Sequence, residues 1–225
     1  MDKSLILTEE GSHTILSQQF EATYHSTHGA IQETRTVFVE AGFQHFLNTG
    51  METINILEIG FGTGLNALMT LLAFQKEKVN VNYVTYEAYP IGVELAKKLN
   101  YTSLLEAPKF QEDFIKMHQM QEDSVLFEND LNASFNFQLN IMKFEEITAK
   151  ESFNLIYFDA FAPSTQAHLW ESPFLEKMYE ALLPEGLLVT YCAQGAFKRA
   201  LKAVGFSVKG LPGPIGKREM TVGKK

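Results

Sequence analysis

Residues 57–71, LEIGFGTGLNALMTL, combine a buried strand, three glycines and the start of an apolar helix. Glycine tolerates positive φ and lets another group lie close to the backbone, so a glycine turn between a strand and a helix commonly receives nucleotide-like ligands. The spacing of Gly60, Gly62 and Gly64 is GxGxG, and Glu58 lies inside the strand. Dinucleotide-binding folds use GxGxxG instead. The stretch therefore predicts an α/β fold with a ligand at the end of this strand, and it disfavours a nicotinamide dinucleotide.

Strand-like and helix-like patterns alternate along the rest of the chain. This alternation predicts a Rossmann-like fold, with a mostly parallel sheet and helices on both faces. The last two strand patterns, 206–211 and 217–223, surround LPGPIG and predict a C-terminal antiparallel hairpin. The other expected strands are 13–18, 54–60, 79–88, 133–142, 153–161 and 186–192, and the expected helices are 33–47, 64–77, 91–99, 108–120, 172–183 and 195–205.

No repeat, low-complexity tract or long linker divides the 225 residues, so we expect one structural domain. Within it, residues 1–50 are interpreted as an N-terminal extension that closes over the site, and residues 51–225 as the α/β domain. The first residues do not match a signal peptide, and no apolar run approaches the ~20 residues of a membrane span. Cys192 is the single cysteine and fits a small core residue in a reducing compartment. We therefore expect a cytoplasmic protein without membrane contact.

The formal net charge of −8 argues against broad affinity for nucleic acids. The charge is unevenly distributed, because the acids gather between Glu106 and Asp130 whereas the C-terminal segment from Phe197 is basic. This segment is either a solvated face or a surface that contacts a few phosphates. Its basic residues are Lys198, Arg199, Lys202, Lys209, Lys217, Arg218, Lys224 and Lys225, with Glu219 as the one acid.

The glycine turn preceded by an acid resembles motif I of the S-adenosyl-L-methionine (SAM) methyltransferases. In such sheets the ligand lies beyond the carboxyl ends of the strands. The glycines are then expected to admit the methionine and ribose parts of SAM, with Glu58 near the methionine amino group. The expected cofactor-binding residues of this turn are Glu58, Gly60, Phe61, Gly62, Gly64 and Asn66.

Two more acids follow at the ends of expected strands. Glu87 ends VTYEA, where a carboxylate offers two acceptor oxygens to the ribose hydroxyls. Asp159, in YFDAFAP, is placed to meet the atom that accepts the methyl group, since a buried acid without a role is costly. The alternatives are that the glycines serve packing, that Glu87 is simply exposed, and that Phe161 and Pro163 only pack the loop.

The histidines give little indication of a metal site. His25 and His28 flank Ser26, but no Cys or Asp partner follows at metal-ligand spacing. His168 is interpreted as a loop contact. We therefore expect no metal.

Several segments together resemble one family, the tRNA 5-methylaminomethyl-2-thiouridine methyltransferases, which form the methyltransferase module of MnmC and the stand-alone MnmD-like proteins. The resemblance runs in order from Tyr24 to Gly223. ETRTVF, DAFAP with Trp170, and KREM are more specific than the glycine motif. The matching segments are YHSTHGAIQETRTVFVEAG, LEIGFGTGLNAL, YFDAFAPSTQAHLW, AFKRALKAVGF and GKREMTVG.

This resemblance implies SAM-dependent N-methylation of 5-aminomethyl-(2-thio)uridine at the tRNA wobble position. By position, Asp159 would face the acceptor amine, and Tyr24, Glu33 and Arg35 would close over the cofactor or the uridine. Lys217 and Arg218 would lie near the tRNA or the cleft mouth. MnmC carries an FAD-dependent oxidase half after this module, so a separate enzyme is expected to supply the aminomethyl group. The family's adenine-contacting acid has no counterpart here before Glu145, since Asn140 lies at the end of the strand, and that contact stays open.

Other functions remain open from sequence alone. A SAM-dependent enzyme acting on a small-molecule amine or hydroxyl fits the acidic charge, and a polyamine aminopropyltransferase shares a loosely similar motif around Asp159. A non-catalytic SAM- or RNA-binding module would have no use for this acid.

In the favoured mechanism, Asp159 orients a neutral amine whose pKa the pocket lowers, because an alkyl amine is mostly protonated in water at neutral pH.

Overall fold

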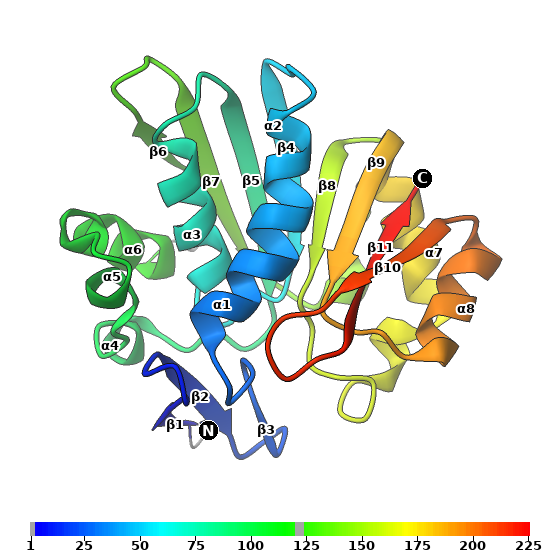
Figure 1. Cartoon of the computed structure of the whole chain (residues 1–225), viewed down its shortest axis with the longest axis horizontal. Helices are drawn as coiled ribbons and strands as arrows, with labels where there is room; N and C mark the ends of the chain where they lie inside the picture. Colours follow the sequence, from blue (N-terminus) through cyan, green and yellow to red (C-terminus); the bar gives the residue numbers. More distant parts are fainter. Residues whose placement is uncertain (1–2, 120–123) are drawn as a thin grey trace.

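The computed structural model describes residues 3–119 and 124–225, and an eight-stranded sheet forms its centre (Figure 1). The strands of this sheet are β4 (Thr53–Ile59), β5 (Asn80–Glu87), β6 (Val125–Glu128), β7 (Ser134–Ile141), β8 (Phe153–Phe158), β9 (Leu182–Thr190), β10 (Ser207–Pro212) and β11 (Glu219–Lys224). Their order is β10-β11-β9-β8-β4-β5-β7-β6. The inner strands from β9 to β7 run parallel, which confirms the expected Rossmann-like sheet.

Both edges of the sheet are antiparallel. At one edge β11 pairs with β9 and with β10, so the expected C-terminal hairpin is confirmed. At the other edge β6 pairs with β7. Strand β6 was not expected, because only Phe127 of its four residues is buried and so short a strand shows no clear alternation.

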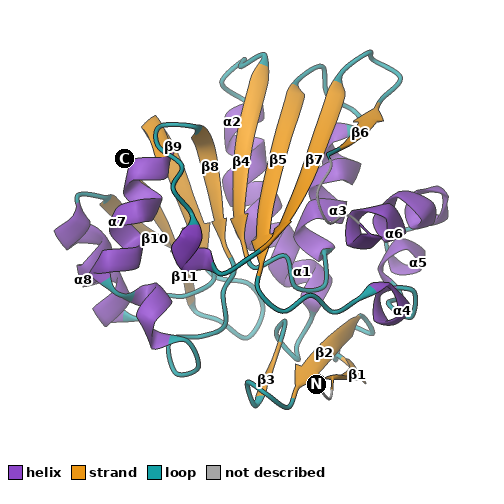
Figure 2. Cartoon of the chain, turned by 180° about the vertical axis from the view of Figure 1, so that it is seen from behind, coloured by secondary structure: helices purple, strands orange, loops and turns teal. Residues whose placement is uncertain are grey.

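Helices cover both faces of the sheet (Figures 1 and 2). The continuous helix α1-η1-α2 and helix α3 cover one face, and α7 and α8 cover the other. The bounds are α1 (Ala30–Thr34), η1 (Arg35–Phe43), α2 (Gln44–Leu47), α3 (Leu65–Phe74), α4 (Val93–Ala96), α5 (Tyr101–Leu104), η2 (Pro108–Phe110), α6 (Gln111–Gln119), η3 (Phe144–Glu146), η4 (Ala167–Trp170), α7 (Ser172–Ala181) and α8 (Gly195–Val204).

The alternation of side chains along β4 divides the core in two. Ile54 and Ile56 belong to the cluster under α1-η1-α2 and α3, whereas Leu57 and Ile59 belong to the cluster under α7 and α8. Each of these residues is fully buried. Burying both faces explains why β4 reads as a nearly continuous apolar run.

Two expected helices differ from their predicted form. The helix expected at 33–47 begins earlier, at Ala30, and its middle part η1 has wider π-helical turns. Gly42 lies in η1, where an added Cβ would be 3.0 Å from the Tyr157 ring, so the helix lies close against β8. The helix expected at 91–99 is only the single turn α4, which follows Gly92 at φ +80°. Of the helix expected at 108–120, the last residue lies outside the described residues.

The N-terminal residues form a small antiparallel sheet of β1 (Lys3–Leu7), β2 (His13–Ser17) and β3 (Ala22–Thr23). Figure 1 shows this sheet below the carboxyl ends of the parallel strands. β2 agrees with the strand expected at 13–18, whereas β1 and β3 were not expected. In residues 3–119 and 124–225 we find no helix of the length and apolar character needed to cross a bilayer.

Candidate functional site

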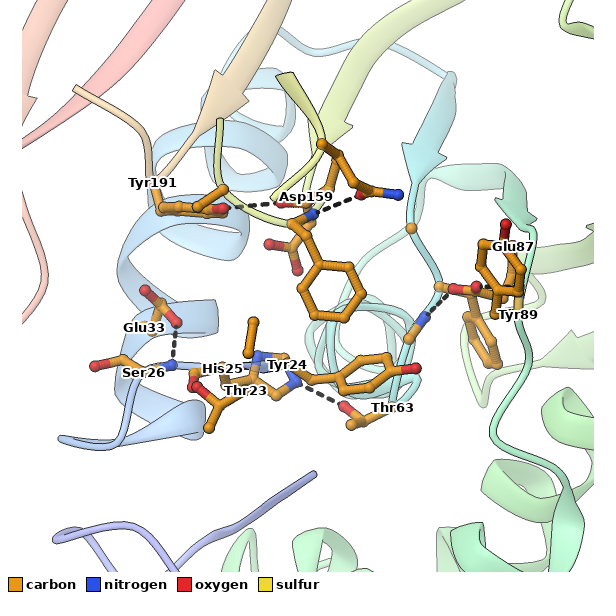
Figure 3. Close-up of a pocket in the computed structure, with 18 of the residues that line it drawn as sticks. Thr23, Tyr24, His25, Ser26, Glu33, Thr63, Glu87, Tyr89, Asp159 and Tyr191 are labelled. Atoms are coloured by element: carbon orange, nitrogen blue, oxygen red, sulfur yellow. Dashed lines mark hydrogen bonds between the residues drawn. The ribbon is translucent and has the colours of Figure 1, made fainter. Parts of the chain in front are cut away.

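A cavity of about 420 Å³ lies at the carboxyl ends of β4, β5, β8 and β9, and the segment after β3 closes one side of it (Figure 3). The chain leaves β4 for β5 on one side and reaches β8 on the other, which makes this the switch point where open α/β sheets bind ligands. The volume is within the range of small-molecule sites. The lining residues are Ala22, Thr23, Tyr24, His25, Ser26, Glu33, Gly60, Phe61, Gly62, Thr63, Glu87, Tyr89, Phe144, Asp159, Ala160, Phe161, Ala162, Gln166, Tyr191 and Lys217.

The turn after β4 needs glycine for close approach. Gly60 has φ +93°, and a Cβ there would lie 2.7 Å from the backbone oxygen of Asp159. Gly62 has φ +53°, and its Cβ would lie 2.9 Å from Cδ1 of Tyr24. Both glycines line the cavity. Gly64, at φ +76°, is not among the lining residues and packs against side chains beneath the turn.

Glu87, the last residue of β5, holds this turn in place. Its Oε2 accepts a hydrogen bond from the Gly62 N–H at 2.9 Å, and its Oε1 accepts one from the Tyr89 N–H at 2.7 Å. Burial raises the pKa of this carboxyl, and the backbone donors and the Lys3 ammonium oppose that rise. The side chain therefore joins the glycine turn to the segment that follows β5.

Asp159 follows β8, and its carboxylate is held at one oxygen only. Asn66 Nδ2 donates to Oδ2 at 2.8 Å, and Thr34 Oγ1 in turn donates to Asn66 Oδ1 at 2.9 Å. Among the described residues, no protein donor forms a hydrogen bond with Oδ1. Burial raises the pKa of Asp159 to about 7, with a further rise from Glu33 that Asn66 and Lys217 oppose. The carboxylate therefore keeps one oxygen available to a ligand in the cavity.

Glu33 of α1 also lines the cavity and is 4% exposed. Its Oε2 accepts a hydrogen bond from the Ser26 N–H at 2.9 Å, and its Oε1 accepts one from the Lys217 ammonium. The same ammonium lies 3.9 Å from the centroid of the Tyr191 ring, a cation–π contact. The pair joins the N-terminal helix to the loop that precedes β11.

Glu58 lies behind the cavity, within the sheet. It is fully buried, and neither carboxyl oxygen has a hydrogen-bond partner among the described residues. Burial raises the pKa of Glu58 to about 8, so the side chain is largely protonated at neutral pH. Its register partners Thr85 and Tyr157 lie on the same face of the sheet. This is not a position from which Glu58 lines the cavity.

The structure brings most of the sequence-predicted residues together. Nine of them line the cavity: Tyr24, Glu33, Gly60, Phe61, Gly62, Glu87, Asp159, Phe161 and Lys217. Asn66 reaches it only through Asp159. Arg35 and Arg218 are exposed, and Pro163 is half-buried beside the cavity loop. The predicted residues outside the lining are Arg35, Glu58, Gly64, Asn66, Pro163 and Arg218.

Several lining residues escaped the sequence analysis. Tyr191 follows β9 directly, so the strand-end argument that found Glu87 and Asp159 would have found it as well. His25 is hydrogen-bonded through Nε2 to Thr63 Oγ1 at 2.6 Å, and burial lowers its pKa to about 4, so it is neutral. No spacing in the sequence indicates that contact. The other polar or aromatic lining residues not anticipated are Thr23, Ser26, Tyr89, Phe144 and Gln166.

Aromatic rings form one wall of the cavity. The Phe161 ring lies 5.0 Å from that of Tyr24 and 4.6 Å from that of Phe20, measured between centroids. Trp170 Nε1 donates to the Phe161 carbonyl oxygen at 2.8 Å, and Phe161 N–H donates to Gln166 Oε1 at 3.2 Å. These bonds fix the loop after β8 and with it the ring that faces the cavity.

No group of three or more His, Cys, Asp or Glu side chains suited to a metal ion occurs within residues 3–119 and 124–225. His168 instead pairs with Glu145 at 2.9 Å in an exposed position.

Comparison with known sequences identifies a family. Residues 106–225, just over half of the chain, match the family model described as S-adenosyl-L-methionine-dependent methyltransferase. The bifunctional protein MnmC of tRNA 5-methylaminomethyl-2-thiouridine biosynthesis from Leptospira interrogans is 27% identical over 97% of this chain. That from Burkholderia mallei is 26% identical over 98%. The chain spans about a third of the length of these relatives, 35% in both cases.

Solved structures support the fold. MNMC2 from Aquifex aeolicus superposes with a TM-score of 0.76 at 23% identity, covering 99% of this chain and 70% of that one. Spermidine synthase from Thermotoga maritima superposes with a TM-score of 0.57 at 17% identity, covering 95% and 69%. At these identities the similarity establishes a shared fold and leaves the substrate open.

Proposed function

The chain belongs to the S-adenosyl-L-methionine-dependent methyltransferase family, and from that premise we propose that it methylates the primary amine of 5-aminomethyl-(2-thio)uridine at the wobble position of tRNA. The observation that carries the proposal is Asp159, a carboxylate at the cavity wall with one oxygen held by Asn66 and the other without a donor among the described residues. The names of the relatives, which refer to tRNA 5-methylaminomethyl-2-thiouridine biosynthesis, support the substrate.

The residues around the glycine turn fit SAM. Tyr24 Oη is buried without a hydrogen-bond partner among the described residues, and Tyr24 lines the cavity, so a polar ligand there would satisfy it. Glu87 is placed to accept hydrogen bonds from ribose hydroxyls, and the backbone at Gly60 and Gly62 lines the space beside it. When bound, SAM supplies an electrophilic methyl group on its sulfonium. Phe61 and Tyr89 complete the wall on this side.

Asp159 acts on the acceptor side. An alkyl ammonium has a pKa near that of lysine, about 10, and carries no free lone pair. The Oδ1 oxygen is available to accept a hydrogen bond from the amine and to orient it, while the apolar rings of Phe161 and Tyr24 lower the pKa of the amine by desolvation. The raised pKa of Asp159 makes it a better proton acceptor than an ordinary aspartate. Alignment of the amine is then the main contribution of the protein.

This role predicts a pH dependence. Asp159 must be ionised to receive the amine, and its pKa is raised to about 7. We expect kcat/KM on aminomethyl tRNA to fall about tenfold per pH unit below that value, whereas a carboxyl with an ordinary pKa would remain ionised down to about pH 4. The measurement is initial methylation rate from about pH 5.5 to 8.5 at constant ionic strength. A flat profile between about pH 5.5 and 7 would show that Asp159 does not titrate in this step.

The exposed arginines are proposed to contact tRNA phosphates. Arg218 directly follows the cavity residue Lys217, and Arg35 lies two residues after the cavity residue Glu33. Neither arginine forms an ion pair within the described part of the chain. Pro163, next to the cavity loop, is proposed to contact the nucleotide. These contacts supply positive charge at the rim of a protein that is acidic overall.

Replacing Arg218 with alanine is therefore expected to weaken tRNA binding and to reduce the slope of log K against log salt by roughly one. The affinity for SAM should stay unchanged. Lys78→Ala is the matched control, because Lys78 is exposed just before β5, at the opposite end of the sheet. Equal salt slopes for wild type and the Arg218 variant would remove this residue from the tRNA contact.

We propose that residues 1–50 act as a cover, since Ala22 to Ser26 line the cavity and Lys3 donates to the Tyr89 carbonyl oxygen at 2.6 Å.

The reaction is proposed to take place in the cytoplasm, and the aminomethyl group is proposed to come from a separate enzyme.

The deciding experiment is methyl transfer from SAM to purified tRNA that carries 5-aminomethyl-2-thiouridine, read by nucleoside mass spectrometry. The expected result is a gain of one methyl group on this tRNA and none on tRNA that lacks the aminomethyl group. No gain, with SAM binding demonstrated in the same preparation, would refute the tRNA substrate. The acidic net charge would then favour a small-molecule amine or hydroxyl as the acceptor.

A further inference from the structure

Three carboxylates line the cavity, but the structure leaves only one of them open to a cation. Glu87 accepts a backbone N–H donor at each oxygen, and its remaining acceptor sites are those proposed for the ribose hydroxyls of SAM. Glu33 accepts the Ser26 N–H at one oxygen and the Lys217 ammonium at the other. Of the three, Asp159 alone has an oxygen to which no described protein group donates.

The cation that pairs with Glu33 comes from a distant part of the chain. Lys217 lies 184 residues away in the loop before β11, and its ammonium is fixed from a second side by the Tyr191 ring. The loop itself is attached to the N-terminal helix, because Ile215 N–H donates to Gln32 Oε1 at 3.0 Å. The Glu33 side chain is shielded from water at 6% exposure, and that of Lys217 is half-buried at 30%. The ammonium is therefore held in place by its surroundings.

We infer that Lys217 is a specificity-determining residue: with Glu87 assigned to the ribose of the cofactor, Lys217 occupies Glu33 and leaves Asp159 as the single anionic contact for the acceptor, so the cavity selects an acceptor with one amine over a polyamine. The inference rests on the proposed function, because it assigns the open oxygen of Asp159 to the acceptor amine.

The electrostatics follow from which groups face one another. A polyamine needs two ionised carboxylates in one cavity, each forming a charge-assisted hydrogen bond with one ammonium. Removal of the Lys217 charge would leave the Glu33 carboxylate without its cation. Glu33 is close enough to Asp159 for its charge to raise the pKa of Asp159. The other titratable groups that face this cluster are His25, Tyr191 and Cys192. All three are uncharged at neutral pH, because burial lowers the pKa of the His25 imidazole and raises those of the Tyr191 phenol and the Cys192 thiol.

The test is spermidine binding by calorimetry, without tRNA, to wild type and to Lys217→Met. Wild type is expected to bind weakly, and the variant about tenfold more tightly, the gain of one charge-assisted hydrogen bond. Lys217→Met combined with Glu33→Gln should return to the weak binding of wild type, because the freed carboxylate is gone. Lys217→Arg should also remain weak, since it preserves the positive charge.

The readouts separate this inference from its premise. Methyl transfer by wild type tests the proposed function, whereas the spermidine affinities are measured without any transfer. In the methylation assay, spermidine should become a competitive inhibitor for Lys217→Met only. Lys198→Met is the matched control, because Lys198 pairs with Glu219 outside the cavity lining. Equal spermidine affinity of wild type and Lys217→Met, with both folded by thermal melting, would overturn the inference, as would tight binding by the double variant.

Discussion

Replacement of Asp159 with alanine is expected to lower kcat on aminomethyl tRNA by about 100- to 1,000-fold while the affinity for SAM stays within about twofold. The variant loses the carboxylate that, within residues 3–119 and 124–225, has an oxygen without a protein donor, so the amine is neither oriented nor relieved of its proton. The glycine turn and Glu87 do not depend on this side chain, because their hydrogen bonds involve Gly62 and Tyr89. Single-turnover methylation and calorimetry of SAM measure the two quantities separately.

Asp159→Asn is the matched control for folding. Its amide oxygen can still accept the bond from Asn66, but it carries no charge, so activity should fall to a similar extent. The folded pKa of Asp159 is raised to about 7 from 3.8, so the free energy of unfolding falls as the pH rises between these two values, and the full cost of the buried carboxylate is present above about pH 7. We therefore expect the asparagine variant to melt no lower than wild type at about pH 8. Full turnover by either variant would exclude Asp159 from the mechanism.

Replacement of Glu87 with alanine is the change with the largest expected effect on cofactor binding. The variant leaves the Gly62 and Tyr89 N–H groups without their acceptor and removes the acid proposed for the ribose hydroxyls. The two proposed hydrogen bonds from the ribose hydroxyls to the Glu87 carboxylate, at about 1.5 kcal/mol each, correspond to a loss of roughly 100-fold in SAM affinity. Calorimetry of SAM at constant pH measures it.

The comparison variant is Glu94→Ala, which removes an exposed acid of α4 that is paired with Lys97. It should bind SAM as wild type does. The SAM affinity of Glu87→Gln should lie between those of wild type and Glu87→Ala, because its amide oxygen can accept only one of the two backbone hydrogen bonds. Unchanged SAM affinity in Glu87→Ala would place the cofactor elsewhere in the molecule.

Strand ends explain why several of the site residues were predictable. In a parallel sheet, residues that end neighbouring strands meet at one edge, so Gly60, Glu87 and Asp159 converge although they lie far apart in the chain. Their positions follow from periodicity and from the glycine turn, without knowledge of helix packing. Tyr191 follows from the same rule.

Other features depend on contacts that no local pattern reports. The nine residues of η1 form π-helical turns where Gly42 meets the side chains of β8 and β9, and the bare sequence reads there as an ordinary helix. β6 pairs at an edge with one buried residue. Gly64 belongs to the predicted motif, yet its missing side chain accommodates packing beneath the turn.

The sheet, its C-terminal hairpin, the glycine turn and the acids at the strand ends could be predicted from the sequence, because these depend on local conformation and on the two-residue period of buried strands. Which of these acids keeps an oxygen available to a ligand depends instead on contacts between distant elements. Lys217 reaches Glu33 through the antiparallel hairpin that inserts β11 beside β9, and Asn66 reaches Asp159 across the first turn of α3. Hydrogen bonds between side chains so distant in sequence depend on how whole elements pack, and no spacing along the chain encodes them.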